Sequence, residues 1–163
     1  MEYEWVTHPF GPLYDQNSRT LLLGSIPSPK SREIGFYYGH PQNRFWPVLA
    51  AVFGEPPPQT IAQKRALALR HGVALWDTLA CCEIRGASDA AIRNPVANDI
   101  ASFLKETQIQ SIFCTGAVSF RWYEKLCRPK TGLAAVKLPS TSAANAAWSF
   151  ERLVSAYAQI RTS

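Results

Sequence analysis

The stretch RTLLLGSIPSP, residues 19–29, carries the pattern on which the fold prediction is built. Its apolar half, residues 20–23, is followed at once by glycine, serine and two prolines. A short apolar run that ends in Gly and Pro is typical of a buried strand that enters a loop. Similar runs predict three more strands, over residues 72–76, 109–114 and 133–138.

Between these runs the apolar residues change to helical spacing. Helices are expected after 41–44, over about 60–70 and 96–107, after Thr115-Gly116, and over 142–160. The segment 79–94 is ambiguous. Strands that alternate with helices predict an α/β fold of three layers, with a central four-stranded parallel twisted sheet and helices on both faces.

Ligands of open parallel sheets bind outside the carboxyl ends of the strands. This rule directs attention to the loops that follow Leu23, Trp76, Cys114 and Leu138.

Length and composition limit the class of protein. The chain has 163 residues, 47% of them hydrophobic and 18% charged, so it can form a core of its own. We expect one domain over residues 1–163, with residues 1–18 as an irregular strap packed on it. The apolar runs are too short to cross a bilayer and the acidic start is unlike a secretion signal, so we expect a cytoplasmic protein.

Charge and cysteine spacing bear on the partners. Lys and Arg number 17 against 12 Asp and Glu, and the net charge of +5 is compatible with nucleic acid as a partner. Cys81 and Cys82 are adjacent, whereas Cys114 and Cys127 are isolated, so the spacing fits neither a zinc site nor a redox pair. We therefore expect no disulfide framework and no bound metal.

The stretch GFYYGHPQNRFW, residues 35–46, places aromatic rings beside hydrogen-bonding groups. Nucleobases stack on aromatic faces with about 1–3 kcal/mol for each base. Phe45 and Trp46 are expected in the core. Tyr37 and Tyr38 precede Gly39 in a loop, where a role in the buried core is less natural.

Two loops at predicted strand ends are open to two interpretations. The segment GSIPSP, residues 24–29, is either a plain strand-to-helix turn or part of a binding site. The segment PSTSAAN, residues 139–145, is expected to open the last helix. Its hydroxyls and free backbone N–H groups form either an anion site or an ordinary N-cap.

Taken together, three segments resemble the uracil-DNA glycosylase superfamily, and within it the branch that removes hypoxanthine from DNA. They are GSIPS at 24–28, FYYGHPQNRFW at 36–46 and LPSTSAAN at 138–145. The resemblance covers the chain from about residue 14 to the final helix. It implies a monofunctional DNA glycosylase of base excision repair, whose partner is DNA with deaminated bases. We expect a monomer without cofactor or metal cluster.

The resemblance also implies roles for single residues. Many superfamily members place a water-activating Asn or Asp in the first loop, where this chain has Ile26. The hypoxanthine branch uses the Asn of its H-P-x-N-x-F-W string, which is Asn43, as the catalytic residue. Tyr38 matches the aromatic residue on which the extruded base stacks, and Asp77 matches a strand-end position that reads the base edge in some relatives.

Two groups of residues follow from the resemblance. The implied base-binding group is Ser25, Ile26, Tyr38, His40 and Asp77. The implied group that contacts phosphates and wedges the duplex is Ser140, Thr141, Ser142, Ala143 and Asn145.

The implied chemistry is hydrolysis of an N-glycosidic bond after the nucleotide has left the base stack. An amide is not a strong base, so Asn43 would position a water through its amide oxygen. His40 either donates to the base or a phosphate, or fixes the loop. Hypoxanthine is the expected base, with uracil and xanthine as alternatives. No lysine lies in the three segments, so no Schiff-base lyase step is expected.

Two other functions have to be weighed against this one. A catalytically silent DNA-binding or lesion-sensing protein of the same fold would explain Ile26 in the first loop, but it leaves Asn43 without a role. A glycoside hydrolase needs two carboxylates that flank one bond. Of the predicted strand-end loops, only the one with Asp77 supplies a carboxylate.

Overall fold

The computed structural model describes residues 2–85 and 91–162. Its central layer is a four-stranded sheet in the order β3-β2-β6-β7. The strands are β2 (Thr20–Gly24), β3 (Val73–Asp77), β6 (Ser111–Thr115) and β7 (Ala135–Leu138). All three strand pairs are parallel, which confirms the predicted sheet.

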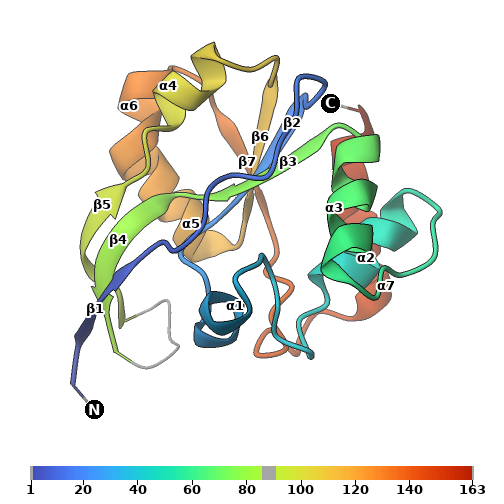
Figure 1. The fold of residues 1–163 in the computed structure, drawn as a ribbon, viewed down its shortest axis with the longest axis horizontal. Coiled ribbons are helices and arrows are strands. Elements are labelled where there is room, and N and C mark those ends of the chain that lie inside the picture. Colours follow the sequence, from blue (N-terminus) through green and yellow to red (C-terminus); the bar gives the residue numbers. More distant parts are fainter. Residues whose placement is uncertain (1, 86–90, 163) are drawn as a thin grey trace.

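Helices cover both faces of this sheet, as Figure 1 shows, and the predicted α/β fold is confirmed. One face carries α2 (Phe45–Val52), α3 (Ile61–Arg70) and α7 (Phe150–Tyr157). The other face carries α4 (Ile100–Lys105), α5 (Ala117–Trp122), a π-helical turn (Tyr123–Cys127) and α6 (Arg128–Thr131).

Successive side chains of β2 enter two different cores. Leu22 packs with the residues beneath α2 and α7, whereas Leu21 and Leu23 pack with those beneath α4 and the π-helical turn. All five residues of β2 are buried because both faces of the sheet are covered. This double burial explains why the strand appears in the sequence as an uninterrupted apolar run.

A second, antiparallel sheet was not predicted. It has the order β1-β4-β5, with β1 (Glu4–Thr7), β4 (Leu79–Ile84) and β5 (Arg93–Ala97). The N-terminal strap expected to be irregular therefore contains a strand, and its sequence alone showed no strand pattern. The ambiguous segment 79–94 supplies β4 and the start of β5, while its residues 86–90 lie outside the described residues.

The helix expected over 96–107 starts later. Val96 belongs to β5, and the helix begins at Ile100. Asp99 sets this start because its side chain accepts the Ser102 N–H at 3.1 Å, as an N-cap does. The preceding residues instead pair with β4.

The structure also differs from the prediction in the helices that follow the two polar loops. A short helix, α1 (Pro29–Ile34), follows Ser28, whose hydroxyl caps it, where only a turn was expected. The last helix, expected from residue 142, begins at Phe150 with Ser149 as its N-cap. A 3-10 turn, Ala158–Thr162, continues it to the end of the described chain.

The helices of the described residues were also compared with the dimensions of a bilayer. None of them combines the length and the apolar character that a membrane-spanning segment requires.

Candidate active site

The carboxyl ends of all four parallel strands open onto one cavity. Gly24, Asp77, Thr115 and Leu138 are the last residues of β2, β3, β6 and β7, and all four line it. The cavity volume is about 940 Å³, near the upper end of the range of about 300–1,000 Å³ that is usual for ligand pockets. The position agrees with the rule for open parallel sheets.

Most of the residues singled out in the sequence line this cavity. They are Ser25, Ile26, Tyr38, Asn43, Asp77, Ser140, Thr141, Ser142 and Asn145. Two are not brought there: His40 and Ala143 are exposed and are not among the lining residues. The ring nitrogen Nδ1 of His40 accepts the Gln42 N–H at 3.1 Å. This contact fits the loop-fixing alternative for His40.

Asn43 is held by hydrogen bonds to its amide oxygen. Oδ1 accepts the Phe45 N–H at 2.9 Å and the Thr141 hydroxyl at 2.8 Å. The Phe45 N–H can only donate, so these two bonds determine which end of the amide faces them. Both lone pairs of Oδ1 are in use, and the amide nitrogen Nδ2 is the end of Asn43 that is left to a ligand.

Tyr38 lies between the first loop and α2. Its ring stacks on Phe45 with centroids 3.9 Å apart, and its hydroxyl is 2.9 Å from Thr115 Oγ1. Burial, followed by the nearby charge of Asp77, raises the pKa of Tyr38 well above its ordinary value, so the hydroxyl keeps its proton. The backbone of Tyr38 has φ of +51°, a left-handed conformation that is uncommon for a residue with a side chain.

Arg44 fastens the loop that follows β7. Its backbone N–H donates to the carbonyl of Thr141 at 3.0 Å. Its guanidinium donates to the carbonyls of Ser142, Asn145 and Trp148. The loop is thereby tied to the N-terminal end of α2 by a side chain next to Asn43, and the two motif segments form one unit.

The loop after β7 does not contain the helix N-terminus that was expected there. Hydroxyls of Ser140 and Ser142 accept the N–H groups of Ser142 and Ala144, at 3.1 and 3.2 Å. The backbone N–H groups of this loop are therefore partly used within it, and the helix dipole of α7 starts further on, at Phe150. The serine hydroxyls can still donate their own O–H groups outward.

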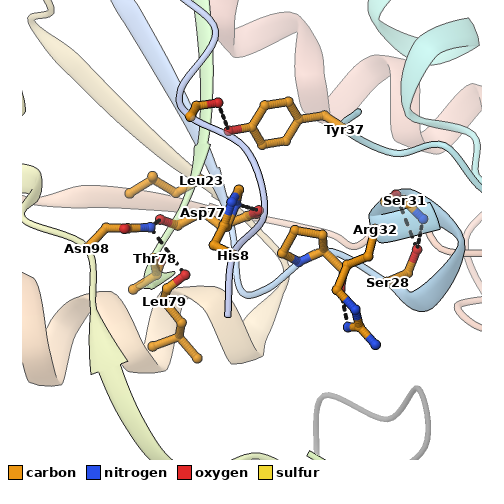
Figure 2. A network of polar contacts seen from close by, with 12 residues as sticks. His8, Leu23, Ser28, Ser31, Arg32, Tyr37, Asp77, Thr78, Leu79 and Asn98 are labelled. Atoms are coloured by element: carbon orange, nitrogen blue, oxygen red, sulfur yellow. Dashed lines mark hydrogen bonds and ion pairs between the residues drawn. The ribbon is translucent and has the colours of Figure 1, made fainter. Parts of the chain in front are cut away.

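Asp77 is buried beneath the cavity and paired with a residue that the sequence did not point out. Its Oδ2 lies 2.6 Å from His8 Nε2, and the two side chains are only 5% and 4% exposed. Figure 2 shows the pair with its neighbours: the Asn98 amide donates to the backbone carbonyls of Asp77 and Leu79. A single histidine in a Pro-rich N-terminal segment gives no pattern that could have identified it.

Among the lining residues that the sequence analysis missed, three have side chains of chemical interest. Thr115, Lys137 and Trp148 line the cavity, together with the predicted residues. Thr115 could have been found as the first residue after the third predicted strand, 109–114, which in the structure extends to Thr115. Lys137 is an exposed residue of β7, next to the exposed Val136, and Trp148 is the large residue in an Ala-rich loop. Neither forms part of a periodic pattern.

The thiols give no sign of a reactive cysteine or of a metal site. No disulfide joins the four cysteines, which all lie among the described residues, and burial raises the pKa of Cys114 to about 12 and that of Cys127 to about 11. A buried thiol that stays protonated is a poor nucleophile. Across residues 2–85 and 91–162, no group of three or more His, Cys, Asp or Glu side chains is placed to hold a metal ion.

Known proteins resemble this chain in sequence or in structure. A protein named hypoxanthine DNA glycosylase from Methanosarcina acetivorans is 31% identical over 144 residues, which are 88% of this chain and 90% of that protein. One of the same name from Methanosarcina barkeri is 37% identical over 98 residues, 60% of this chain and 61% of the relative.

A solution NMR structure of a protein from Methanosarcina acetivorans has the same fold. Its TM-score is 0.80 at 29% identity, and the match covers 94% of this chain and 95% of that one. Residues 12–161 match the family described as the Uracil DNA glycosylase superfamily. This range includes all the strands of the parallel sheet and every residue named above as lining the cavity, so the chain belongs to the uracil DNA glycosylase superfamily.

Proposed function

We propose that this chain is a monofunctional DNA glycosylase that extrudes a deaminated base from DNA and hydrolyses its N-glycosidic bond, with hypoxanthine as the main substrate. The observation that carries the proposal is the convergence of Asn43, Tyr38 and Asp77 on one cavity at the strand ends. The names of the two relatives support hypoxanthine as the base.

The reaction requires a pocket because a base within the duplex cannot be reached. Extrusion of the nucleotide costs a few kcal/mol, and it costs least at a mispaired base. Tyr38 offers an aromatic ring that is already held by Phe45, so stacking of the base costs little additional ordering. The hydroxyls of Ser140 and Ser142 would hold the phosphates on either side of the extruded nucleotide.

Asn43 would position the attacking water. Because its Oδ1 already accepts from Phe45 and Thr141, we assign the water to Nδ2, rather than to the amide oxygen expected from the sequence. A donor at this position holds the water oxygen but does not deprotonate it. Bond cleavage then depends on positioning and on stabilisation of the negative charge on the departing base by hydrogen-bond donors fixed in the cavity.

Asp77 would select the base. An ionised carboxylate only accepts hydrogen bonds. Hypoxanthine presents an N1–H group and uracil an N3–H group, whereas adenine and cytosine present a lone pair at the corresponding nitrogens. Deamination therefore converts a base that the carboxylate repels into one that it binds. This chemistry leaves uracil and xanthine as further substrates.

Two alternatives are weaker. A lesion-sensing protein without activity is favoured by Ile26, which is buried in the first loop and cannot polarise water. Asn43 supplies a polar group in the same cavity, however. A two-carboxylate glycoside hydrolase is disfavoured because Asp77 is the one carboxylate among the described residues that line the cavity.

The test is base release from duplexes that contain one deoxyinosine, deoxyuridine or deoxyxanthosine, followed by alkaline cleavage of the abasic sites. We expect strand breaks at deoxyinosine under single-turnover conditions, and none at deoxyadenosine. Release of no base from any duplex would favour the lesion-sensing alternative. Breaks that form before alkali is added would contradict the monofunctional assignment, and Lys137 in the cavity would then be the candidate amine.

A further inference from the structure

The pair of His8 and Asp77 extends the site beyond the residues that carry the family match. His8 precedes the matched range, residues 12–161. It reaches Asp77 because its backbone N–H donates to the Ala80 carbonyl at 2.7 Å, which fixes the N-terminal segment alongside β4. Leu13 then bridges to β3 in the antiparallel sense, so the chain between these points passes the carboxyl end of β3.

The pairing satisfies a strong physical requirement. A carboxylate that is 95% buried is stable only with a hydrogen-bonded or charged partner. The ring nitrogen Nε2 of His8 provides this partner at 2.6 Å, a distance typical of a hydrogen bond to an ionised group. Edge contact with Phe10, with ring centroids 4.8 Å apart, holds the imidazole in place, and the ring centroid of Tyr37 lies 6.0 Å from that of His8.

The second carboxylate oxygen faces a different neighbour. Oδ1 of Asp77 packs directly against Gly24. If Gly24 carried a Cβ atom, that atom would lie only 2.4 Å from Oδ1. This hypothetical Cβ position on Gly24 is 3.3 Å from the Tyr38 hydroxyl oxygen. Gly24 and Tyr38 both line the cavity. With Oδ2 bound to His8, Oδ1 is the carboxylate oxygen placed among cavity-lining groups.

The other ring nitrogen indicates the form of His8. Nδ1 is buried and has no hydrogen-bond partner among the described residues. A doubly protonated ring would bury an N–H group without an acceptor, which costs more than leaving a lone pair there. The neutral tautomer with its hydrogen on Nε2 is therefore favoured, and it donates to Oδ2.

We propose that His8 is a positioning residue for base selection: its Nε2–H group holds Asp77 so that Oδ1 accepts the N–H group of the deaminated base edge. This inference rests on the proposed function. The same hydrogen bond draws negative charge away from Oδ1, and so reduces the repulsion between the carboxylate and a base that departs with negative charge. His8 acts through Asp77 and is not among the residues that line the cavity.

The experiment compares two probes that differ at the selected edge. One duplex carries deoxyinosine and the other carries deoxynebularine, whose purine base has neither the N1–H group nor the O6 atom. Single-turnover release rates and equilibrium affinities are measured for both duplexes. The readout is the ratio of the two release rates, or of the two affinities. General destabilisation of the protein does not change this ratio, because destabilisation affects both duplexes alike.

The variants separate the hydrogen bond from the packing of the ring. His8→Leu removes the donor and keeps the volume, and we expect the inosine preference to fall about tenfold or more, the equivalent of one good hydrogen bond. His8→Gln places an amide donor at a similar reach, and we expect it to keep most of the preference. His71→Gln is the matched control at the C-cap of α3, where His71 contacts Glu55 instead.

Each outcome decides the proposal. It is overturned if His8→Leu keeps the wild-type ratio, or if His8→Gln loses as much as His8→Leu. If His8→Leu does not fold, His8→Asn, which is too short to reach Asp77, takes its place with the same expectation. If the wild-type chain releases no base, the proposed function fails, and the affinity ratio between the two duplexes still supports or overturns the role of His8.

Discussion

The amide oxygen of Asn43 and the hydroxyl of Thr141 are 2.8 Å apart, and this hydrogen bond joins two motif segments that are 98 residues apart in the chain. The guanidinium of Arg44 adds three further bonds to the same loop. The residue proposed to hold the water and the loop proposed to hold the DNA backbone are thus parts of one assembly. Loss of the Thr141 hydroxyl is therefore expected to affect the position of the Asn43 amide.

Asn43→Ala should separate chemistry from binding. We expect the single-turnover rate on deoxyinosine to fall about 100-fold or more, the usual scale for loss of a group that acts in the transition state. Affinity for the duplex should change by less than about threefold, because the phosphate contacts lie elsewhere. The rate is measured by alkaline cleavage and the affinity by fluorescence anisotropy. An unchanged rate would move the catalytic role to another residue.

Thr141→Val tests the bond between the two motifs. The variant keeps the shape of the side chain but loses the donor to Asn43, so that only the Phe45 N–H still holds the amide oxygen. We expect a rate reduction of about fivefold, consistent with one hydrogen bond of about 1 kcal/mol. Thermal unfolding monitors the fold. A Thr141→Ser variant retains the hydroxyl and should remain close to wild type; equal losses in both variants would deny this role.

Tyr38→Phe and Tyr38→Ala distinguish the hydroxyl from the ring. Phenylalanine keeps the stack on Phe45 and loses only the contact with Thr115, so affinity for the extruded base should change little. Alanine removes the surface on which the base stacks, a loss of about 1–3 kcal/mol. A fluorescent base analogue at the lesion reports extrusion. If Tyr38→Ala extrudes and releases the base as wild type does, stacking on this residue is contradicted.

Arg44→Met should loosen the loop after β7. Methionine keeps the aliphatic part of the side chain but leaves the carbonyls of Ser142, Asn145 and Trp148 without their donor. We expect affinity for the lesion duplex to fall about tenfold, since a mobile loop must be ordered on binding. Arg65→Met on α3 is the control for loss of one positive charge. A similar loss in both variants would assign the effect to charge alone.

The decrease in the free energy of unfolding at acid pH should depend in part on Glu55. Hydrogen bonds from Arg70 and His71 lower the pKa of Glu55 from its ordinary 4.5 to about 2. A carboxyl whose pKa is lower in the folded state stabilises the fold above pH 4.5, and this contribution is lost as pH falls from 4.5 to 2. Glu55→Gln should therefore lose stability at neutral pH and be less sensitive to acid in this window.

Chemical denaturation across pH checks the Glu55 prediction. The effect should be small and should shrink in high salt, because the carboxylate and Arg70 are accessible to solvent. Parallel pH profiles for Glu55→Gln and wild type would contradict it.

Much of the site was predictable because it consists of strand ends and local strings. The apolar run of Thr20–Gly24 predicts a strand that is covered on both faces. The rule that ligands bind at the carboxyl ends of parallel strands then places Gly24, Asp77 and Thr115 around one cavity. The strings around Tyr38 and Asn43 carry the resemblance by themselves. These features depend on neighbours within a few residues, and a linear pattern therefore reveals them.

Contacts between distant segments could be decided only by the tertiary structure. His8 meets Asp77 because the N-terminal segment pairs with β4, and Asn43 turns its oxygen to Thr141 because the loop after β7 folds back onto α2. The expected helix from residue 142 fails for the same reason, since its carbonyls are taken by Arg44. Local periodicity specifies which faces of an element are apolar, but hydrogen bonds between segments far apart in the chain exist only once the sheet has brought them together.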